Sequence, residues 1–207
     1  MIWIDGTLVS EGESGVYGER VVQGYRVWDP YRSKFAALAT RYRERNLDLT
    51  GDQKVLYLGA ANGTTVSHVA DYVEVVYAVE FAPHPMQDLV MVARRRKNVI
   101  PIMADAGRPE QYAPLLEQVD LLYQDVAQPT QVSIAIANLI FLRPGGRLIL
   151  MLKSRSVDVS RDPKEVAAEA AAALTAAGLV VESIDWLAPY HPDHAALICR
   201  KGTEEKD

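Results

Sequence analysis

The sequence lacks several features that would place it in a specialised class of protein. It has a single cysteine, Cys199, which excludes a disulfide framework and a thiolate metal cluster, and we expect no metal site. No apolar run reaches the ~18 residues needed to span a membrane, and residues 1–5 show neither the basic start nor the apolar stretch of a signal peptide. We therefore expect a cytoplasmic protein without a membrane association.

An excess of positive charge is also absent. The formal net charge is −5, which argues against a protein that coats nucleic acid through bulk attraction. Two short basic segments, 41–45 and 94–97, remain as candidate RNA or partner contacts, although each is equally well explained as a solvated part of a helix. With 207 residues, 49% of them hydrophobic, the chain can form one catalytic domain and a small appendage.

The first 28 residues predict the appendage, a small β-rich subdomain, and residues 29–207 the main domain. Residues 2–4 and 7–9 read as strands around Asp5-Gly6, a dipeptide suited to a tight hairpin turn. Residues 21–28 are strand-like again. Asp29 and Pro30 then predict the start of a helix, as its N-cap and first residue, which continues over residues 33–45.

From residue 55 onward, short apolar runs alternate with helical stretches. The apolar runs predict strands at 55–58, 75–79, 99–103, 119–123, 147–152, 180–184 and 195–199. The intervening segments predict helices at 64–72, 85–96, 130–142 and 163–177, the last with a capping box at Asp162 and Glu165 and a stop at Gly178. The repeated strand–helix–strand pattern indicates a Rossmann-like α/β fold with helices on both faces of the sheet, and the last two strands predict an antiparallel hairpin.

Three signals stand at the ends of three successive predicted strands. Gly59 and Gly63 lie in the turn after the first strand, where small residues let the backbone approach a ligand. Glu80 ends the second strand and is placed to accept hydrogen bonds from both ribose hydroxyls of an adenosine. Asp105 follows the third strand, where it could accept from an adenine amino group. Each alone could be a packing turn or a solvated acid, but together they predict an adenosine site.

The turn after the first strand lacks the G-x-G-x-x-G pattern of dinucleotide-binding folds. An adenosine site without a pyrophosphate cradle favours S-adenosylmethionine over NAD. The expected fold is therefore that of a class I methyltransferase, with a seven-stranded mixed sheet and the small N-terminal β-rich subdomain.

Charged residues at the fourth and fifth strand ends predict the chemistry. Asp125 follows the fourth strand, where the methyl-bearing sulfur would lie, and Lys153 closes the fifth strand beside it. Lys34, in the helix before the domain, could reach the same place. A ribose hydroxyl must lose its proton as it is methylated, and a lysine near Asp125 could accept it if desolvation lowers the lysine pKa from ~10.4. Each charge alone is also explained as a surface group.

Five segments of the chain resemble the fibrillarin family: 28–34, 57–69, 77–81, 125–129, and Pro189-Tyr190 with Asp193-His194-Ala195. The resemblance extends over nearly the whole chain. It implies guide-directed 2′-O-methylation of ribosomal RNA and, in the archaeal form, of transfer RNA. The absence of a Gly/Arg-rich tail is typical of the archaeal form.

The resemblance also implies site residues and partners. Together with the turn residues Gly59, Ala60 and Gly63, the cofactor contacts would be Thr64, Thr65, Glu80, Phe81, Asp105, Ala106, Asp125, Val126, Ala127 and Gln128. The reacting hydroxyl would be surrounded by Lys34, Asp125, Lys153 and His194, with a structural role for His194 as the alternative. The implied partners are a Nop-domain scaffold protein, a kink-turn-binding ribosomal-type protein, a box C/D guide RNA and an rRNA or tRNA substrate.

Two other functions would share some of these features. A methyltransferase acting on a protein or a small molecule would have the same cofactor site but would need no pair of lysines beside Asp125. A non-catalytic subunit of a ribonucleoprotein would be expected to have a damaged cofactor site, and the intact Gly59, Gly63 and Glu80 argue against it.

Overall fold

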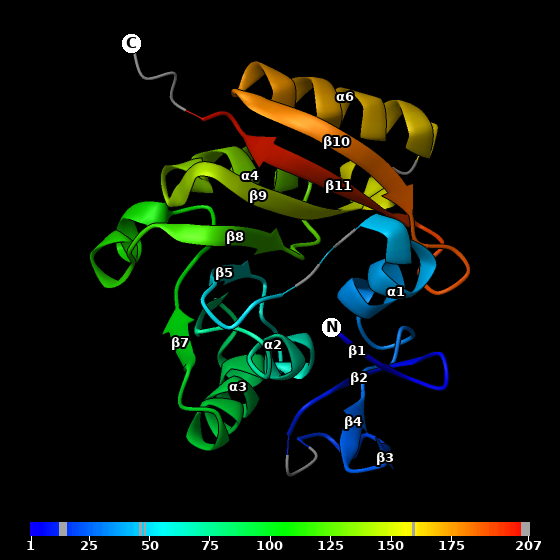
Figure 1. Cartoon of the computed structure of the whole chain (residues 1–207). Coiled ribbons are helices and arrows are strands. Elements are labelled where there is room, and N and C mark those ends of the chain that lie inside the picture. The colour runs from blue at the N-terminus through cyan, green and yellow to red at the C-terminus, as the bar shows by residue number, and fades with distance from the viewer. Residues whose placement is uncertain (13–15, 46, 48, 159, 204–207) are drawn as a thin grey trace.

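The computed structural model describes residues 1–12, 16–45, 47, 49–158 and 160–203, and these residues include two β-sheets (Figure 1). The larger sheet consists of β5 (Lys54–Leu58), β6 (Val75–Glu80), β7 (Val99–Met103), β8 (Val119–Gln124), β9 (Leu142–Lys153), β10 (Leu179–Trp186) and β11 (His194–Lys201). The strand order is β10-β11-β9-β8-β5-β6-β7. Strands β5 to β9 are parallel, and β11 is antiparallel to both β9 and β10. The predicted seven-stranded mixed sheet with a final hairpin is confirmed.

Helices cover both faces of this sheet because its strands bury side chains on both sides. Val55 and Tyr57 of β5 pack with one group of buried residues, and Leu56 and Leu58 pack with another. The first group includes residues of α1 (Lys34–Arg41), α2 (Thr64–Val69) and α3 (Pro83–Arg95), and the second includes residues of α4 (Gln131–Ala137) and α6 (Pro163–Ala176). No helix in the described part of the chain is long and apolar enough to cross a membrane.

The shorter helical segments lie between these elements. They are η1 (Arg43–Arg45), η2 (Pro109–Gln111), η3 (Ala113–Leu115), η4 (Asn138–Ile140) and α5 (Ser154–Val157).

The smaller sheet lies at the N-terminus of the chain. It consists of β1 (Ile2–Ile4), β2 (Thr7–Ser10), β3 (Val21–Val22) and β4 (Tyr25–Val27), in the order β1-β2-β4-β3. The hairpin around Asp5-Gly6 is confirmed. The single strand predicted over residues 21–28 is wrong, because Gln23 and Gly24 have φ angles of 52° and 85° and reverse the chain between β3 and β4.

The predicted helix start at Asp29-Pro30 is also wrong. The Asp29 carboxylate accepts the N–H of Tyr31 at 2.8 Å, and the Asp29 carbonyl accepts the N–H groups of Arg32 and Ser33. These bonds close a turn rather than a helix. Ser33 is the N-cap instead, and its hydroxyl accepts the N–H of Ala36 at 3.3 Å. This shift makes Lys34 the first residue of α1.

The helix predicted over residues 130–142 ends early, and β9 starts where that helix was expected to stop. The strand predicted over residues 147–152 begins earlier, so Gly145 and Gly146 lie inside β9. Gly145 has a φ of 73°, and a Cβ on Gly146 would lie 2.7 Å from the Leu142 side chain and 3.1 Å from the Asp120 carbonyl oxygen. The glycines therefore let β9 pass close to β8, where the pairing shifts register.

The ends of α6 follow the predicted signals more closely. The Asp162 carboxylate caps the helix by accepting the N–H of Lys164, and Gly178, with a φ of 89°, follows its end. Glu165 does not complete a capping box. Its carboxylate lies 3.8 Å from the Arg161 guanidinium instead.

A buried ionic cluster joins the small sheet to the main domain. Arg26 of β4 is fully buried and pairs with Glu19 at 2.5 Å and Asp71 at 2.7 Å. Asp71, which follows α2, also accepts the Arg96 Nε at 2.8 Å and the Ser10 hydroxyl at 2.7 Å. Arg26 belongs to the small sheet, Asp71 follows α2 and Arg96 follows α3. The cluster therefore holds the small sheet against α2 and the end of α3. Arg96 therefore does not contribute to a free basic patch at 94–97.

His68 of α2 lies in the same interface and is fully buried. Its Nδ1 is 2.7 Å from the Ser10 hydroxyl, and its Nε2 is 2.6 Å from the Tyr17 hydroxyl. Because Ser10 donates its own proton to Asp71, we infer that Nδ1 carries the imidazole proton and that Tyr17 donates to Nε2. Burial lowers the pKa of His68 to about 2, so the imidazole is uncharged in the folded protein.

This buried histidine makes the stability of the protein dependent on pH. Between pH ~6.5 and about 2, the unfolded chain binds a proton at His68 that the folded chain does not. The free energy of unfolding should therefore fall as the pH drops below 6.5, with His68 contributing up to about 1.4 kcal/mol per pH unit. Urea denaturation at pH 7.5, 6.5 and 5.5 measures this slope.

The His68→Gln variant should have a shallower slope than the wild type over this pH range. The matched control is His84→Gln, since His84 lies exposed on α3. It should keep the wild-type slope. An unchanged slope in folded His68→Gln would contradict the prediction.

Candidate active site

The turn between β5 and α2 approaches the end of β8 closely. Gly59 has a φ of 80°, and a Cβ at this position would lie 2.4 Å from the Asp125 carbonyl oxygen. Gly63, with a φ of 81°, would meet the side chains of Leu89 and Val92 of α3 at 3.0 Å. Only glycine fits at Gly59, because a side chain would push the turn away from the strand end.

Glu80 holds the turn from the end of β6. Its side chain is nearly buried, and its two carboxylate oxygens accept the N–H groups of Ala61 and Ala82, each at 2.8 Å. Each oxygen of an ionised carboxylate has two lone pairs, so one site on each remains for a further donor. A vicinal diol such as the ribose of an adenosine presents two donors with this geometry.

A cavity of 230 Å³ opens at the carboxyl ends of β5, β6, β7 and β8. Its lining consists of Gly59, Ala61, Val79, Glu80, Phe81, Ala104, Asp105, Ala106, Asp125, Val126, Ala127 and Gln128. The Phe81 ring is 62% exposed and offers a flat apolar surface for an adenine base. The Asp105 carboxylate accepts the N–H of Gly107 at 2.8 Å, which fixes its orientation.

The other residues predicted to bind the cofactor lie outside this lining. Ala60 and Gly63 are buried in the turn. Thr64 lines a neighbouring cavity with Asn62. The Thr65 hydroxyl donates to the Ser33 hydroxyl at 3.0 Å, and so connects the start of α2 to the start of α1.

Lys34 and Asp125 meet beside the cavity. The Lys34 Nζ lies 2.8 Å from both carboxylate oxygens of Asp125, and the two side chains are 20% and 22% exposed. The Asp125 N–H donates to the Leu58 carbonyl, which continues the β5–β8 pairing to the acid itself. Phe35, the residue after Lys34, is fully buried, and its ring stacks on that of Trp28 with the ring centres 5.2 Å apart. This packing holds α1 in position.

Lys153 and His194 lie opposite each other where β9 ends and β11 begins. The Lys153 N–H and carbonyl both pair with the Gln131 side-chain amide, at 3.0 and 3.1 Å. The Lys153 ammonium forms no hydrogen bond or ion pair with any described residue. The His194 Nδ1 is buried and has no partner among the described residues. Burial and the charge of Lys34, with smaller contributions from His191 and Lys153, lower the pKa of His194 to about 4.

His191 is a further candidate that the sequence reasoning missed. Its Nε2 lies 3.0 Å from the Pro30 carbonyl oxygen, and its ring is 5.9 Å from that of His194. Burial and the Lys34 charge lower its pKa. The His-x-x-His spacing before a predicted strand was the available signal.

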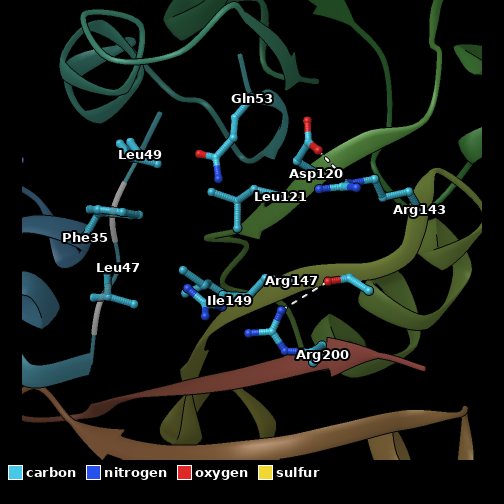
Figure 2. A pocket seen from close by; sticks show the side chains of 11 residues that line it. Phe35, Leu47, Leu49, Gln53, Asp120, Leu121, Arg143, Arg147, Ile149 and Arg200 are labelled. Carbon is cyan, nitrogen blue, oxygen red and sulfur yellow. Dashed lines mark hydrogen bonds and ion pairs between the residues drawn. The ribbon is translucent and has the colours of Figure 1, made fainter. Parts of the chain in front are cut away.

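A second cavity, of 150 Å³, lies at the amino ends of β8 and β9 (Figure 2). Three arginines line it, and each lies near a carboxylate. Arg143 pairs with Asp120 at 2.6 Å, and Arg200 and Arg147 share Glu182 at 2.7 and 3.7 Å. Figure 2 shows Arg143 turned toward Asp120. Because ligands of such folds bind at the carboxyl ends of the strands, this cavity is not the candidate active site.

The strand order, the glycine turn after β5, the acid that ends β6 and the cavity between them define a class I S-adenosylmethionine-dependent methyltransferase. The model of the fibrillarin family matches residues 7–203. The chain belongs to the fibrillarin family.

Individual relatives agree with this assignment. The chain is 66% identical to a fibrillarin-like rRNA/tRNA 2′-O-methyltransferase of Methanoculleus marisnigri, over 97% of this chain and 99% of that protein. It is similar to the fibrillarin in a fibrillarin/Nop5p complex, with a TM-score of 0.89 and 40% identity over 96% of this chain and 95% of that one. It is also similar to Aeropyrum pernix fibrillarin with natively bound S-adenosyl-L-methionine, with a TM-score of 0.81 and 42% identity over 90% and 84% of the two chains.

The position of Glu80 predicts the effect of its removal on cofactor binding. Glu80→Ala should weaken S-adenosylmethionine binding by about 1.5–3 kcal/mol, the range for hydrogen bonds to a charged group. Titration calorimetry on the isolated protein measures the change. Glu169→Ala, an exposed acid on α6, is the control and should bind as the wild type does. Wild-type affinity in folded Glu80→Ala would remove Glu80 from the site.

Proposed function

We propose that this chain is the catalytic subunit of a box C/D guide ribonucleoprotein and methylates ribose 2′-hydroxyls of pre-rRNA and tRNA. The observation that carries the proposal is the group of Lys34, Asp125, Lys153 and His194 beside the adenosine-sized cavity. A methyltransferase acting on proteins or small molecules would not need two lysines there. The name of the Methanoculleus marisnigri relative supports the same reaction.

The cofactor contacts follow from the positions of the lining residues. Glu80 accepts hydrogen bonds from the ribose, Phe81 packs against the adenine, and Asp105 with Ala106 lies at the adenine edge. The segment Asp125, Val126, Ala127 and Gln128 lies toward the methionine end, and Gly59, Ala60, Gly63, Thr64 and Thr65 shape the turn that supports it. When bound, S-adenosylmethionine supplies an electrophilic methyl group on a sulfonium.

The protein has to align the ribose hydroxyl and remove its proton. Asp125 is held by two hydrogen bonds from Lys34 and offers its carboxylate as an acceptor in a fixed position. The Lys153 ammonium has no carboxylate partner among the described residues, so it is available to the substrate oxygen. It acts there as a donor that orients the hydroxyl or, once deprotonated, as the base. His194 is uncharged at neutral pH and adds no repulsion toward these lysines.

Lys153→Ala should reduce the rate of methyl transfer by at least ~10²-fold, in line with the loss of a positioned acid–base group. The affinity for S-adenosylmethionine should barely change, because the ammonium does not line the cavity. Single-turnover rates and calorimetry measure the two quantities separately. Lys164→Ala, an exposed lysine on α6, should match the wild type. Equal losses in rate and cofactor affinity would indicate a structural role instead.

The variant Lys153→Gln distinguishes the two roles of Lys153 in the same assay. An amide can donate a hydrogen bond but cannot act as the base. If Lys153 only orients the hydroxyl, Lys153→Gln should be faster than Lys153→Ala, whereas the two variants should be equally slow if Lys153 is the base.

The partners of the complex would supply target selection. The solved complex of a related fibrillarin with Nop5p supports a Nop-domain scaffold, and the family supports a kink-turn-binding protein and a box C/D guide RNA. Base pairing with the guide would select the target rather than contacts from this chain.

The chain alone should methylate RNA poorly, since its net charge of −5 gives little general attraction to a polyanion. A scaffold that holds the guide–target duplex would raise the effective concentration of the ribose at Lys34 and Asp125. Methyl transfer to a matched target should therefore appear when scaffold, kink-turn protein and guide are added. A guide mismatch at the target should abolish transfer. Efficient, site-selective transfer by the lone chain would contradict this prediction.

A further inference from the structure

A groove outside the cofactor cavity lies between the small sheet and the turn that precedes α1. It has a volume of 530 Å³, and the residues important here are Tyr17, Arg20, Pro30, Tyr31, Arg32 and Tyr190. We call it the tyrosine groove. Its lining comes from two distant parts of the chain, which only the folded protein brings together: the N-terminal residues 7, 17–20, 27 and 29–32, and Tyr190.

The tyrosine groove presents aromatic rings with free hydroxyls. Tyr31 is 66% exposed, and its ring lies 4.9 Å from that of Tyr190 at an angle of 77°. Neither hydroxyl has a hydrogen-bond partner among the described residues. The Tyr31 N–H is fixed by the Asp29 carboxylate and the Tyr190 N–H by the Leu187 carbonyl, so the backbone holds both rings in place.

The same groove contains two arginines that form no ion pair within the described chain. Arg20 and Arg32 are exposed, and neither forms an ion pair with a described residue. The Arg32 guanidinium lies 5.6 Å from the centre of the Tyr17 ring, whose hydroxyl is fixed on His68. Two acids also line the groove. The Glu19 carboxylate is 2% exposed and pairs with the buried Arg26, and the Asp29 carboxylate accepts the Tyr31 N–H. Because neither acid pairs with Arg20 or Arg32, both guanidinium groups remain for an external anion.

The groove is linked to the reaction centre through Pro30 and His191. Pro30 lines it, and the Pro30 carbonyl lies 3.0 Å from the Nε2 of His191, which packs against His194. Arg32 is two residues before Lys34, on the turn that leads into α1. A strand whose ribose reaches Lys34 and Asp125 would therefore have its neighbouring nucleotides beside these rings.

We propose that the tyrosine groove binds the ribose–phosphate backbone of the nucleotides that flank the methylated one. Arg20 and Arg32 pair with phosphates, and the hydroxyls of Tyr31 and Tyr190 contact ribose 2′-hydroxyls. A paired RNA strand exposes these two groups along its wide, shallow minor groove, so the recognition is of backbone and not of sequence. The inference rests on the proposed function, since it assumes an RNA ribose at Lys34 and Asp125.

The test uses the assembled complex with a target already annealed to the guide. This removes target capture from the measurement, so the single-turnover rate reports alignment alone. The variants are Tyr31→Phe and the double variant Arg20→Ala with Arg32→Ala, and Lys164→Ala is a remote control that removes one charge. Arg94→Ala tests the competing basic segment at the end of α3. Calorimetry with S-adenosylmethionine should give wild-type affinity for every variant, because none of these residues lines the cofactor cavity.

We expect the arginine double variant to slow methyl transfer by about 10-fold or more, with a weaker dependence of the rate on salt. Tyr31→Phe should slow it by about 3- to 10-fold, the effect of one lost hydrogen bond. Targets with a 2′-deoxy nucleotide on one side of the methylated ribose should slow the wild type by a similar factor. On one of the two sides, the deoxy target should slow Tyr31→Phe no further, because the same contact is already missing.

Three results would overturn the proposal. One is a double variant as fast as Lys164→Ala. Another is that each of the two deoxy targets slows the Tyr31→Phe variant by the same factor as it slows the wild type. The third is a larger loss in Arg94→Ala, which would place the flanking RNA at the end of α3. The wild-type complex serves as the separate test of the proposed function: if it transfers no methyl group, that function fails, whereas a fully active wild type with unaffected groove variants rejects the groove alone.

Discussion

The ion pair between Lys34 and Asp125 is the contact on which the rest of the site depends. The two residues are 91 positions apart in the sequence, and the Lys34 Nζ lies 2.8 Å from the Asp125 carboxylate oxygens. The contact therefore forms only when both α1 and β8 are correctly placed. Lys34 is in place because Ser33 starts the helix there and because Phe35, buried against Trp28, anchors α1. Asp125 is in place because Gly59 lets the turn after β5 lie against the end of β8.

The N-terminal sheet helps to hold α2, and through it α1, in position. Its buried Arg26 and Ser10 both reach Asp71, and Ser10 also contacts His68. Both partners belong to α2 or to the turn after it, and α2 begins at the cofactor turn. The Thr65 hydroxyl then connects α2 to the N-cap of α1. The sheet thus helps to fix α1, whose first residue is Lys34, and α2, which follows the glycine turn.

Several cationic or titratable side chains lie close together beside the cavity, and this affects the pKa values of the two histidines. Lys34, Lys153 and two histidines lie near one carboxylate. Burial and the charge of Lys34 lower the pKa of both imidazoles, and Lys153 adds to the effect on His194. His194 therefore stays uncharged at neutral pH, and its buried Nδ1 has no hydrogen-bond partner among the described residues. An uncharged imidazole adds no repulsion toward the two lysines.

The sequence by itself determined the order of the strands along the chain, the class of fold and the residues at the strand ends. Periodic apolar runs report burial directly, and parallel strands bring Gly59, Glu80 and Asp125 to one edge of the sheet whatever the loops do. Helix starts and strand starts were harder to predict: the sequence placed a helix start at Asp29, and it began the strand that became β9 only at residue 147.

Only the tertiary structure decided which distant groups meet. The pairing of His191 with Pro30, the burial of Arg96 on Asp71 and the groove between Tyr31 and Tyr190 each depend on two segments that no local pattern relates. A hydrophobic period records whether a residue is buried, but it carries no information about which residue lies across the contact. That choice is made by the packing of whole elements, so it is settled only when the chain has folded.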